Sequence, residues 1–138
     1  MPVTDQALFE AAEKVRLRAY APYSKFTVGA AILADDGKIY SGCNVENAAY
    51  PQGNCAEASA IAAMIAGGGK RIARVYVTGP GVAPVTPCGG CRQRLREFAD
   101  LDVTVISHGI DGSPLVSTLG DLLPHSFGPE FLDTHKDT

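Results

Sequence analysis

Three cysteines at the expected starts of two helices limit most strongly how this chain can fold. Cys55 stands two residues before Glu57 in the stretch N-C-A-E-A. Cys88 and Cys91 form a C-x2-C pair in the stretch T-P-C-G-G-C-R. Because zinc binds thiolates, and a helix N-terminus favours a thiolate through its unpaired N–H groups and dipole, both stretches are suited to hold a metal. A shared metal requires a fold in which the two helix starts meet.

The number of cysteines in this set favours a catalytic zinc over a structural one. Structural zinc is usually closed by four protein ligands, whereas catalytic zinc keeps one position for water. Water bound in that position has a pKa of about 7, and the nearby Glu57 carboxylate is expected to shuttle its proton rather than bind the metal. Two alternatives stay open: the C-x2-C pair is two buried cysteines, or the site is a non-catalytic zinc module with a fourth protein ligand.

The remaining candidate ligands receive plainer interpretations. Cys43 lies in an apolar strand and is expected to be a core thiol. The three histidines, His108, His125 and His135, fall in loops or the tail and are expected at the surface rather than on a metal. The stretch G-G-G-K at residues 67–70 lacks the spacing of a phosphate-binding loop, so it is interpreted as a helix stop.

Alternating helix and strand patterns predict an α/β fold. The chain order is helix, strand, strand, helix, strand, helix, strand, strand, which favours one mixed sheet with helices on both faces, a three-layer α/β/α sandwich with five strands. Thr4 is expected to cap the first helix and Asn54 the second. The expected helices cover residues 4–20, 55–66 and 89–99, with a last turn at 119–124; the expected strands cover 26–34, 38–45, 73–78, 102–107 and 114–118.

Length and charge exclude several classes of protein. With 138 residues the chain fits a single domain spanning residues 1–138, with a flexible tail after about residue 131. A net charge of −3 disfavours a nucleic-acid partner. No apolar run reaches the roughly 20 residues of a membrane span, and the N-terminus does not read as a secretory signal, so a cytoplasmic location is expected. In that compartment, four cysteines indicate metal binding or burial rather than disulfides.

The cysteine stretches, C-A-E followed by P-C-G-G-C-R-Q, resemble the signature of zinc-dependent deaminases. The first residue of this signature is histidine or cysteine, and here it is Cys55. In this respect the chain resembles the small homotetrameric cytidine deaminases. Further stretches at residues 22–31, 42–48 and 122–129 also resemble that family, so the resemblance covers nearly the whole chain. It implies deamination of cytidine and deoxycytidine to uridine and deoxyuridine with release of ammonia, in pyrimidine salvage. It also implies one zinc ion per subunit.

The resemblance assigns the metal site residue by residue. Cys55, Cys88 and Cys91 match the zinc ligands, and Glu57 matches the catalytic acid and base. The implied reaction uses Glu57 twice: it moves a proton from water to N3 of cytosine and then a proton to the leaving amino group.

The resemblance also implies how the nucleoside is held. Asn44 and Glu46 match a pair that hydrogen-bonds the ribose 3′-hydroxyl, and Phe26 matches an aromatic ring that packs on the pyrimidine. Ala48 and Ala56 are expected to offer backbone groups to the base edge. The rival interpretation is a deaminase for another aminopyrimidine, such as a nucleoside antibiotic of the blasticidin type, against which the Asn44 and Glu46 pair speaks.

Two aromatic residues match positions that neighbouring subunits lend to each other's pockets. Tyr50 and Phe127 therefore imply a homotetramer with shared pockets. Taken singly, Tyr50 would be interpreted as a core residue and Phe127 as a buried anchor for the tail.

One position departs from the family pattern. Family members often carry arginine directly after the catalytic glutamate, where this chain has Ala58. Three thiolates around one zinc ion leave a net negative charge. We expect Arg92, directly after Cys91, to offset that charge by hydrogen-bonding a zinc-bound sulfur; the alternative is a solvated first-turn arginine.

Overall fold

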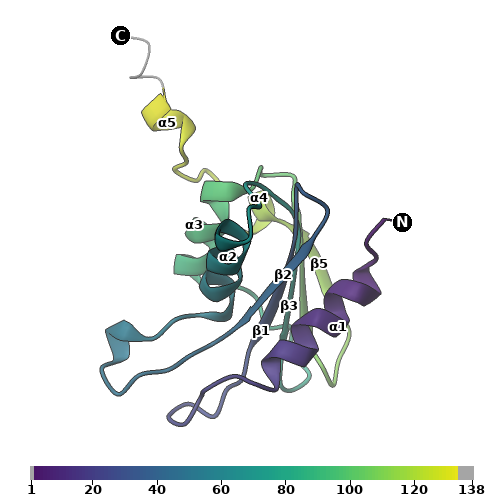
Figure 1. Cartoon of the computed structure of the whole chain (residues 1–138), viewed down its shortest axis with the longest axis vertical. Coiled ribbons are helices and arrows are strands. Elements are labelled where there is room, and N and C mark those ends of the chain that lie inside the picture. Colours follow the sequence, from purple (N-terminus) through teal and green to yellow (C-terminus); the bar gives the residue numbers. More distant parts are fainter. Residues whose placement is uncertain (1, 134–138) are drawn as a thin grey trace.

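A mixed five-stranded sheet forms the centre of the structure, a computed structural model that describes residues 2–133 (Figure 1). The strand order is β2-β1-β3-β4-β5, and only the β3–β4 pair is parallel within the described chain. The strands are β1 (Gly29–Ala34), β2 (Ile39–Cys43), β3 (Ile72–Gly79), β4 (Thr104–Gly109) and β5 (Leu115–Thr118).

Helices cover both faces of this sheet, which confirms the predicted three-layer α/β/α sandwich (Figure 1). Helix α1 (Asp5–Arg16) packs on one face through Leu8 and Ala12, against Tyr76 and Ile106 of the sheet. The other face carries α2 (Ala56–Ala66) and α3 (Gly89–Phe98), whose apolar side chains bury the β3 and β4 valines. Shorter helical segments lie at Tyr50–Gln52 (3-10), Leu119–Leu122 (α4) and Glu130–Asp133 (α5).

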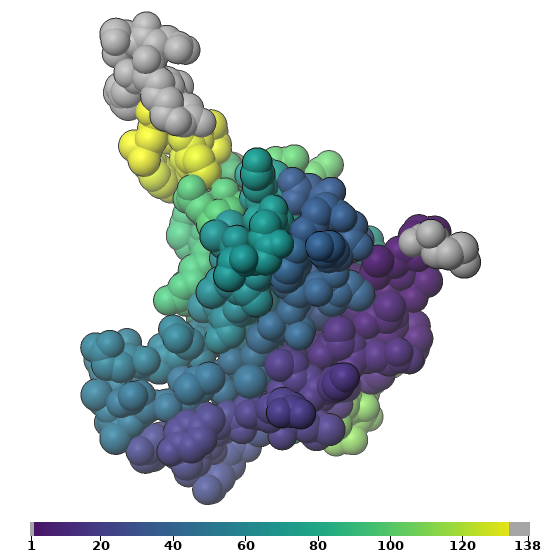
Figure 2. Space-filling view, viewed as in Figure 1, coloured from purple at the N-terminus to yellow at the C-terminus, as the bar shows by residue number. Residues whose placement is uncertain are grey.

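Three predicted element ends are wrong in the same region. Helix α1 ends at Arg16 rather than near residue 20, β1 begins at Gly29 rather than at residue 26, and β2 ends at Cys43. The residues released from these elements form two loops at one end of the molecule, 17–28 and 44–55. Both loops project from the body, in indigo and blue in Figure 2.

A short backbone ladder ties these two loops together. Tyr20 N–H donates to the Asn44 carbonyl at 3.0 Å, and Glu46 N–H donates to the Tyr20 carbonyl at 2.8 Å. On its other side, Val45 exchanges two backbone hydrogen bonds with Asn54, at 2.9 and 2.8 Å. The segment around Val45 therefore connects the loop before β1 to the start of α2.

The predictions at the remaining positions had mixed outcomes. Thr4 caps α1 as predicted, but Cys55 rather than Asn54 is the cap residue of α2. His125 is exposed as predicted, whereas His108 is half-buried, with Nδ1 2.8 Å from the Tyr76 hydroxyl and Nε2 3.0 Å from a backbone carbonyl. His135 and most of the tail expected to be flexible lie outside the described residues. None of the helices described between residues 2 and 133 is long and apolar enough to cross a membrane.

Candidate active site

The three predicted cysteine ligands meet at the N-termini of α2 and α3. Their sulfur atoms all lie within 4.8 Å of one another, and among the described residues no other histidine, cysteine or carboxylate joins this cluster. Cys55 is half-buried, Cys88 is exposed and Cys91 is fully buried. Because zinc–sulfur bonds are about 2.3 Å long, sulfurs at this spacing can reach one ion with small side-chain rotations. The cluster therefore fits a zinc ion held by three thiolates.

The backbone sets this meeting of sulfurs. Cys55 and Cys88 are the cap residues of their helices, with extended backbone at φ −74°, ψ 157° and φ −66°, ψ 166°. Cys91 follows Cys88 in the first turn of α3, so the pair presents two sulfurs from one helix start. Since α2 and α3 pack side by side on the same face of the sheet, the third sulfur comes from the adjacent helix start (Figure 1).

The three thiols differ in their tendency to ionise. Burial raises the pKa of the Cys55 thiol and, more strongly, that of the Cys91 thiol. The backbone N–H of Cys91 lowers the pKa of the Cys88 thiol. A metal that binds here must displace the remaining protons, because thiolates rather than thiols are ligands. Of the three thiols, Cys88 is therefore the one that ionises most readily, and it is also exposed to an arriving metal ion.

Glu57 lies beside this cluster in the first turn of α2 and is 5% exposed. Burial raises the pKa of the Glu57 carboxyl, while a hydrogen bond with Cys91 and the positive charge of Arg94 lower it in part. Raising the pKa of a carboxyl group brings it closer to the working pH, which suits a group that must both accept and return a proton. The structure brings Glu57 to the metal ligands without making it one of them.

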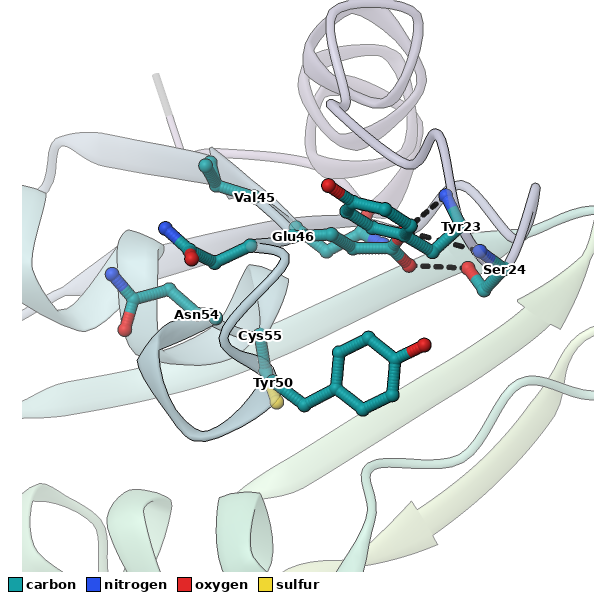
Figure 3. A pocket seen from close by; sticks show the side chains of 10 residues that line it. Tyr23, Ser24, Val45, Glu46, Tyr50, Asn54 and Cys55 are labelled. Atoms are coloured by element: carbon teal, nitrogen blue, oxygen red, sulfur yellow. Dashed lines mark hydrogen bonds between the residues drawn. The ribbon is translucent and has the colours of Figure 1, made fainter.

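A cavity of about 520 Å3 opens next to Cys55, between the two projecting loops (Figure 3). Its walls come from the segments joined by the Val45 backbone ladder. It is lined by Tyr23, Ser24, Asn44, Val45, Glu46, Asn47, Tyr50, Gly53, Asn54 and Cys55. The volume suits a small molecule, and most of the polar lining groups stand on the wall formed by the loop after β2.

Asn44 and Glu46 both line this cavity, and both already hold the opposite loop. Asn44 Nδ2 donates to the Phe26 carbonyl and Asn44 Oδ1 accepts from Val28 N–H, each at 2.9 Å. Glu46 accepts the backbone N–H groups of Tyr23 and Ser24 at 3.0 and 3.1 Å, and also the Ser24 hydroxyl (Figure 3). These bonds lower the pKa of Glu46, the Ser24 hydroxyl most of all. The predicted ribose pair is therefore also a loop clamp, a role that the sequence did not reveal.

Of the other predicted substrate-binding residues on these loops and on α2, only Tyr50 lines the cavity. Tyr50 lines the cavity and is 76% exposed. Its ring meets the Tyr23 ring edge to face, with 6.1 Å between the ring centroids. Phe26 is 44% exposed on the loop before β1, and Ala48 is exposed on the loop after β2; neither is among the lining residues. Ala56 is buried at the first position of α2.

Phe127 does not reach the cavity of its own chain. It precedes α5, which lies at the opposite end of the molecule from the two cavity loops (Figure 1). Its ring stacks on Phe131 at 5.1 Å and is 57% exposed, and its carbonyl accepts a hydrogen bond from Gln93 at 2.9 Å. The interpretation of Phe127 as a buried anchor is wrong.

The predicted contact between Arg92 and a sulfur is wrong. Arg92 donates instead to the carbonyls of Pro87 at 2.6 Å and Leu122 at 2.8 Å, so it holds the loop before α3 rather than the cluster. The guanidinium that reaches a sulfur belongs to Arg94, whose Nη1 lies 3.5 Å from Cys91 Sγ. Helical spacing could have found it, because residues three apart share a helix face whereas adjacent residues do not.

Comparisons with known proteins agree with this site. Residues 2–107 match the family described as the cytidine and deoxycytidylate deaminase zinc-binding region. A cytidine deaminase of Sporosarcina psychrophila is 42% identical over 127 residues, which cover 92% of this chain and 93% of that protein. A cytidine deaminase of Mycobacterium tuberculosis H37Rv is 43% identical over 119 residues, which cover 86% and 85%.

The fold agrees as well. The crystal structure of cytidine deaminase from Burkholderia pseudomallei matches with a TM-score of 0.86 at 44% identity, covering 91% of this chain and 100% of that one. With this identity and coverage, and with three cysteine sulfurs placed to hold the metal, the chain belongs to the zinc-binding cytidine and deoxycytidylate deaminase family.

Proposed function

We propose that this protein catalyses the hydrolytic deamination of cytidine and deoxycytidine to uridine and deoxyuridine, with release of ammonia. The observation that carries the proposal is the buried carboxyl of Glu57 beside a three-sulfur cluster, with a nucleoside-sized cavity opening at Cys55. Similarity to several cytidine deaminases supports the choice of substrate.

Glu57 performs the proton transfers in this proposal. Zinc held by the three cysteines would supply a Lewis acid that lowers the pKa of the attacking water. Glu57 takes the proton given up by the attacking water and delivers it to N3 of the cytosine ring. It then takes the proton of the hydroxyl group now at C4 and passes it to the amino group, so that ammonia leaves and a carbonyl remains. Burial raises the pKa of this carboxyl, which favours its holding a proton between the two transfers.

The cavity residues position the nucleoside in front of that carboxyl. Asn44 and Glu46 hydrogen-bond the ribose 3′-hydroxyl, and Phe26, carried by the loop that they clamp, packs on the pyrimidine. Backbone groups of Ala48 and Ala56 contact the base edge. None of these proposed contacts requires the 2′-hydroxyl, so deoxycytidine is included.

Measuring ammonia release tests this function directly. We expect release from cytidine and from deoxycytidine, loss of activity after zinc is removed by a chelator, and recovery when zinc is returned. Failure with both nucleosides, together with turnover of a blasticidin-type aminopyrimidine, would transfer the proposal to that substrate class. A zinc-loaded protein that turns over neither substrate would indicate a non-catalytic zinc module.

The proposal also includes a homotetramer whose pockets are shared between subunits. Phe127 supports sharing because it is exposed at the end of the chain away from its own cavity. Tyr50 supports it because its ring stands at a cavity wall and is largely uncovered in a single chain. In the tetramer these two rings would complete pockets formed mainly by neighbouring subunits.

Subunit complementation tests pocket sharing. Glu57→Gln leaves Phe127 intact, and Phe127→Ala leaves Glu57 intact. If pockets are shared, mixing the two weakly active variants and allowing their subunits to exchange should restore activity above the sum of the separate proteins. Mixing without any gain, in tetramers shown by mass to contain both chains, would contradict sharing. Sedimentation gives the oligomeric state independently.

Three broader expectations complete the proposal. The whole chain forms a single deaminase domain, which the family match over residues 2–107 supports. The enzyme works in the cytoplasm, in pyrimidine salvage, on free nucleosides rather than on nucleic acid. The net charge of −3 supports the last point, because a phosphate backbone would be repelled.

A further inference from the structure

Arg94 is the one arginine or lysine among residues 2–133 seen to donate a hydrogen bond to a cysteine of the cluster. Its Nη1 lies 3.5 Å from Cys91 Sγ, one turn along α3. Arg94 as a whole is exposed, whereas Cys91 is fully buried, so the side chain folds back over the helix start to reach the sulfur. The side chain passes close to Gly90, where an added Cβ would lie 3.7 Å from Arg94 Nη1, an ordinary van der Waals contact.

The loaded cluster needs such a cation. Three thiolates around a divalent ion carry one net negative charge, and the site stands partly in a low-dielectric interior. The N-termini of α2 and α3 offset some of it, but a helix end carries only about half a charge. Arg92 cannot contribute through the same contact because its guanidinium is engaged by two backbone carbonyls.

The two helices differ in the residue that stands three positions after a cluster cysteine. Arg94 stands three residues after Cys91 on α3, and Ala58 stands three residues after Cys55 on α2. Residues with this spacing share a helix face. Ala58 and Arg94 line one shallow groove between the helices, so a charge from either helix would enter the same space. In this chain only the α3 position holds a cation.

We propose that Arg94 is a positioning residue of the metal centre, which holds the Cys91 thiolate by a charge-assisted hydrogen bond and offsets the negative charge of the zinc-loaded cluster. The proposal rests on the proposed zinc site. Without Arg94, the loaded, anionic cluster loses stabilisation relative to the metal-free protein with protonated thiols. Zinc should then leave more readily, although the three ligands themselves are unchanged.

Zinc retention tests this role directly. Arg94→Ala, Arg94→Gln and Arg94→Lys are compared with the native protein by measuring zinc release to excess chelator and zinc content after dialysis. Residues that hold a metal ligand from outside typically change metal affinity by about 10–100-fold, so we expect a loss of that size in Arg94→Ala. Arg94→Gln should resemble Arg94→Ala because it lacks the charge, and Arg94→Lys should retain zinc better than both.

Two further measurements separate charge from packing. Adding Ala58→Arg to Arg94→Ala should restore part of the zinc retention, because the new guanidinium enters the same groove. Raising the salt concentration should narrow the difference between native protein and Arg94→Ala, since exposed charges are screened. Arg18→Ala, which removes an exposed arginine elsewhere, is the matched control and should retain zinc as the native protein does.

The outcomes distinguish this role from the proposed function. If the native protein holds no zinc, the metal site itself is wrong. If the native protein holds zinc and Arg94→Ala retains it equally well, only the assignment of Arg94 is overturned. Equal loss in Arg94→Lys and Arg94→Ala, with no effect of Ala58→Arg, would assign the contact to packing rather than charge.

Discussion

The carboxylate of Glu46 accepts hydrogen bonds from both the backbone N–H and the hydroxyl of Ser24. The same carboxylate is proposed to bind the ribose, so one side chain sets the position of the loop before β1 and receives the sugar. Asn44 repeats this arrangement through the Phe26 carbonyl. The proposed recognition of the sugar and the proposed packing of Phe26 on the base are therefore coupled.

Replacing Glu46 by alanine should weaken cytidine use and loosen the loop together. A lost hydrogen bond to a bound group costs about 1–3 kcal/mol, which lowers kcat/KM roughly 5- to 150-fold. Lys25 is exposed on the same loop with a left-handed backbone at φ 59°, so trypsin cleavage after it reports how firmly the loop is held. We expect faster cleavage in Glu46→Ala.

Ser24→Ala is the matched control for this experiment. It removes the hydroxyl that donates to Glu46 and accepts from Phe26 N–H, but it leaves the Glu46 carboxylate. Cleavage should therefore accelerate while kcat/KM for cytidine falls less than in Glu46→Ala. Free cytosine should be a poor substrate of the native enzyme. If Ser24→Ala and Glu46→Ala lost activity equally, Glu46 would be acting through the loop alone.

Glu57→Gln should abolish most turnover while keeping the fold and the zinc. The amide has the shape of the carboxyl group but cannot carry the proton, and positioned acid–base groups contribute roughly 10²–10⁴-fold to rate. Uridine formation and zinc content, measured on the same preparation, check the expectation. Glu97→Gln, on the exposed surface of α3, should behave as the native enzyme does. Near-normal turnover in Glu57→Gln would remove Glu57 from the mechanism.

The metal-free protein should be alkylated at its three cluster cysteines in a fixed order. Cys88 should react first because it is exposed and its pKa is lowered by the Cys91 N–H. Cys91 should react last because it is fully buried and its pKa is raised by that burial. Peptide mapping by mass spectrometry after timed iodoacetamide treatment gives the order. Zinc should protect all three, and equal rates in the presence and absence of zinc would argue against them as ligands.

Acid should destabilise the protein partly through Glu13. Its carboxylate pairs with Arg16 at 2.6 Å, with the two side chains 22% and 10% exposed, and this bond lowers the pKa of Glu13 below its ordinary 4.5. The unfolded chain therefore binds a proton at higher pH than the folded one. The stabilisation is complete above pH 4.5 and is lost as the pH falls through the lower, folded-state pKa.

Urea unfolding at several pH values measures this contribution. At pH 7, Glu13→Gln should be about 1–3 kcal/mol less stable than the native protein, the cost of removing a hydrogen-bonded charge from its partner. That difference should shrink as the pH is lowered below 4.5. Comparing two proteins that both lose zinc in acid removes the metal from the result. Glu10→Gln, on the exposed side of α1, should show no such trend, and a difference independent of pH would exclude the ion pair as its source.

The zinc-binding residues could be predicted from sequence because local rules determine them. Helix starts favour thiolates, and the C-x2-C spacing places two sulfurs on one helix start, so Cys88 and Cys91 needed no knowledge of distant contacts. The mixed sheet could also be predicted from the sequence, because apolar strands that alternate with helices are compatible with few folds.

The errors arose where distant segments decide the structure. The expected extensions of α1, β1 and β2 became loops because the segment around Val45 pairs with Tyr20 and Asn54 instead. His108 on β4 pairs with Thr78 on β3, two residues along that strand from Tyr76. It is half-buried because the Tyr76 hydroxyl, distant in sequence, lies within hydrogen-bond distance of its ring. Arg92 follows Cys91 directly in the sequence, but adjacent residues do not share a helix face, whereas Arg94, three residues on, does.

The backbone ladder around Val45 holds the loop after β2 in place independently of the side chains that line the cavity. Its hydrogen bonds to Tyr20 and Asn54 use only backbone atoms, so they are indifferent to the side chains that the segment displays. Substitution of a lining residue such as Val45, whose side chain makes no hydrogen bond, should therefore remodel the cavity without moving Cys55 away from its partners. A lineage, or a protein engineer, could in this way select new nucleosides while inheriting the metal chemistry intact.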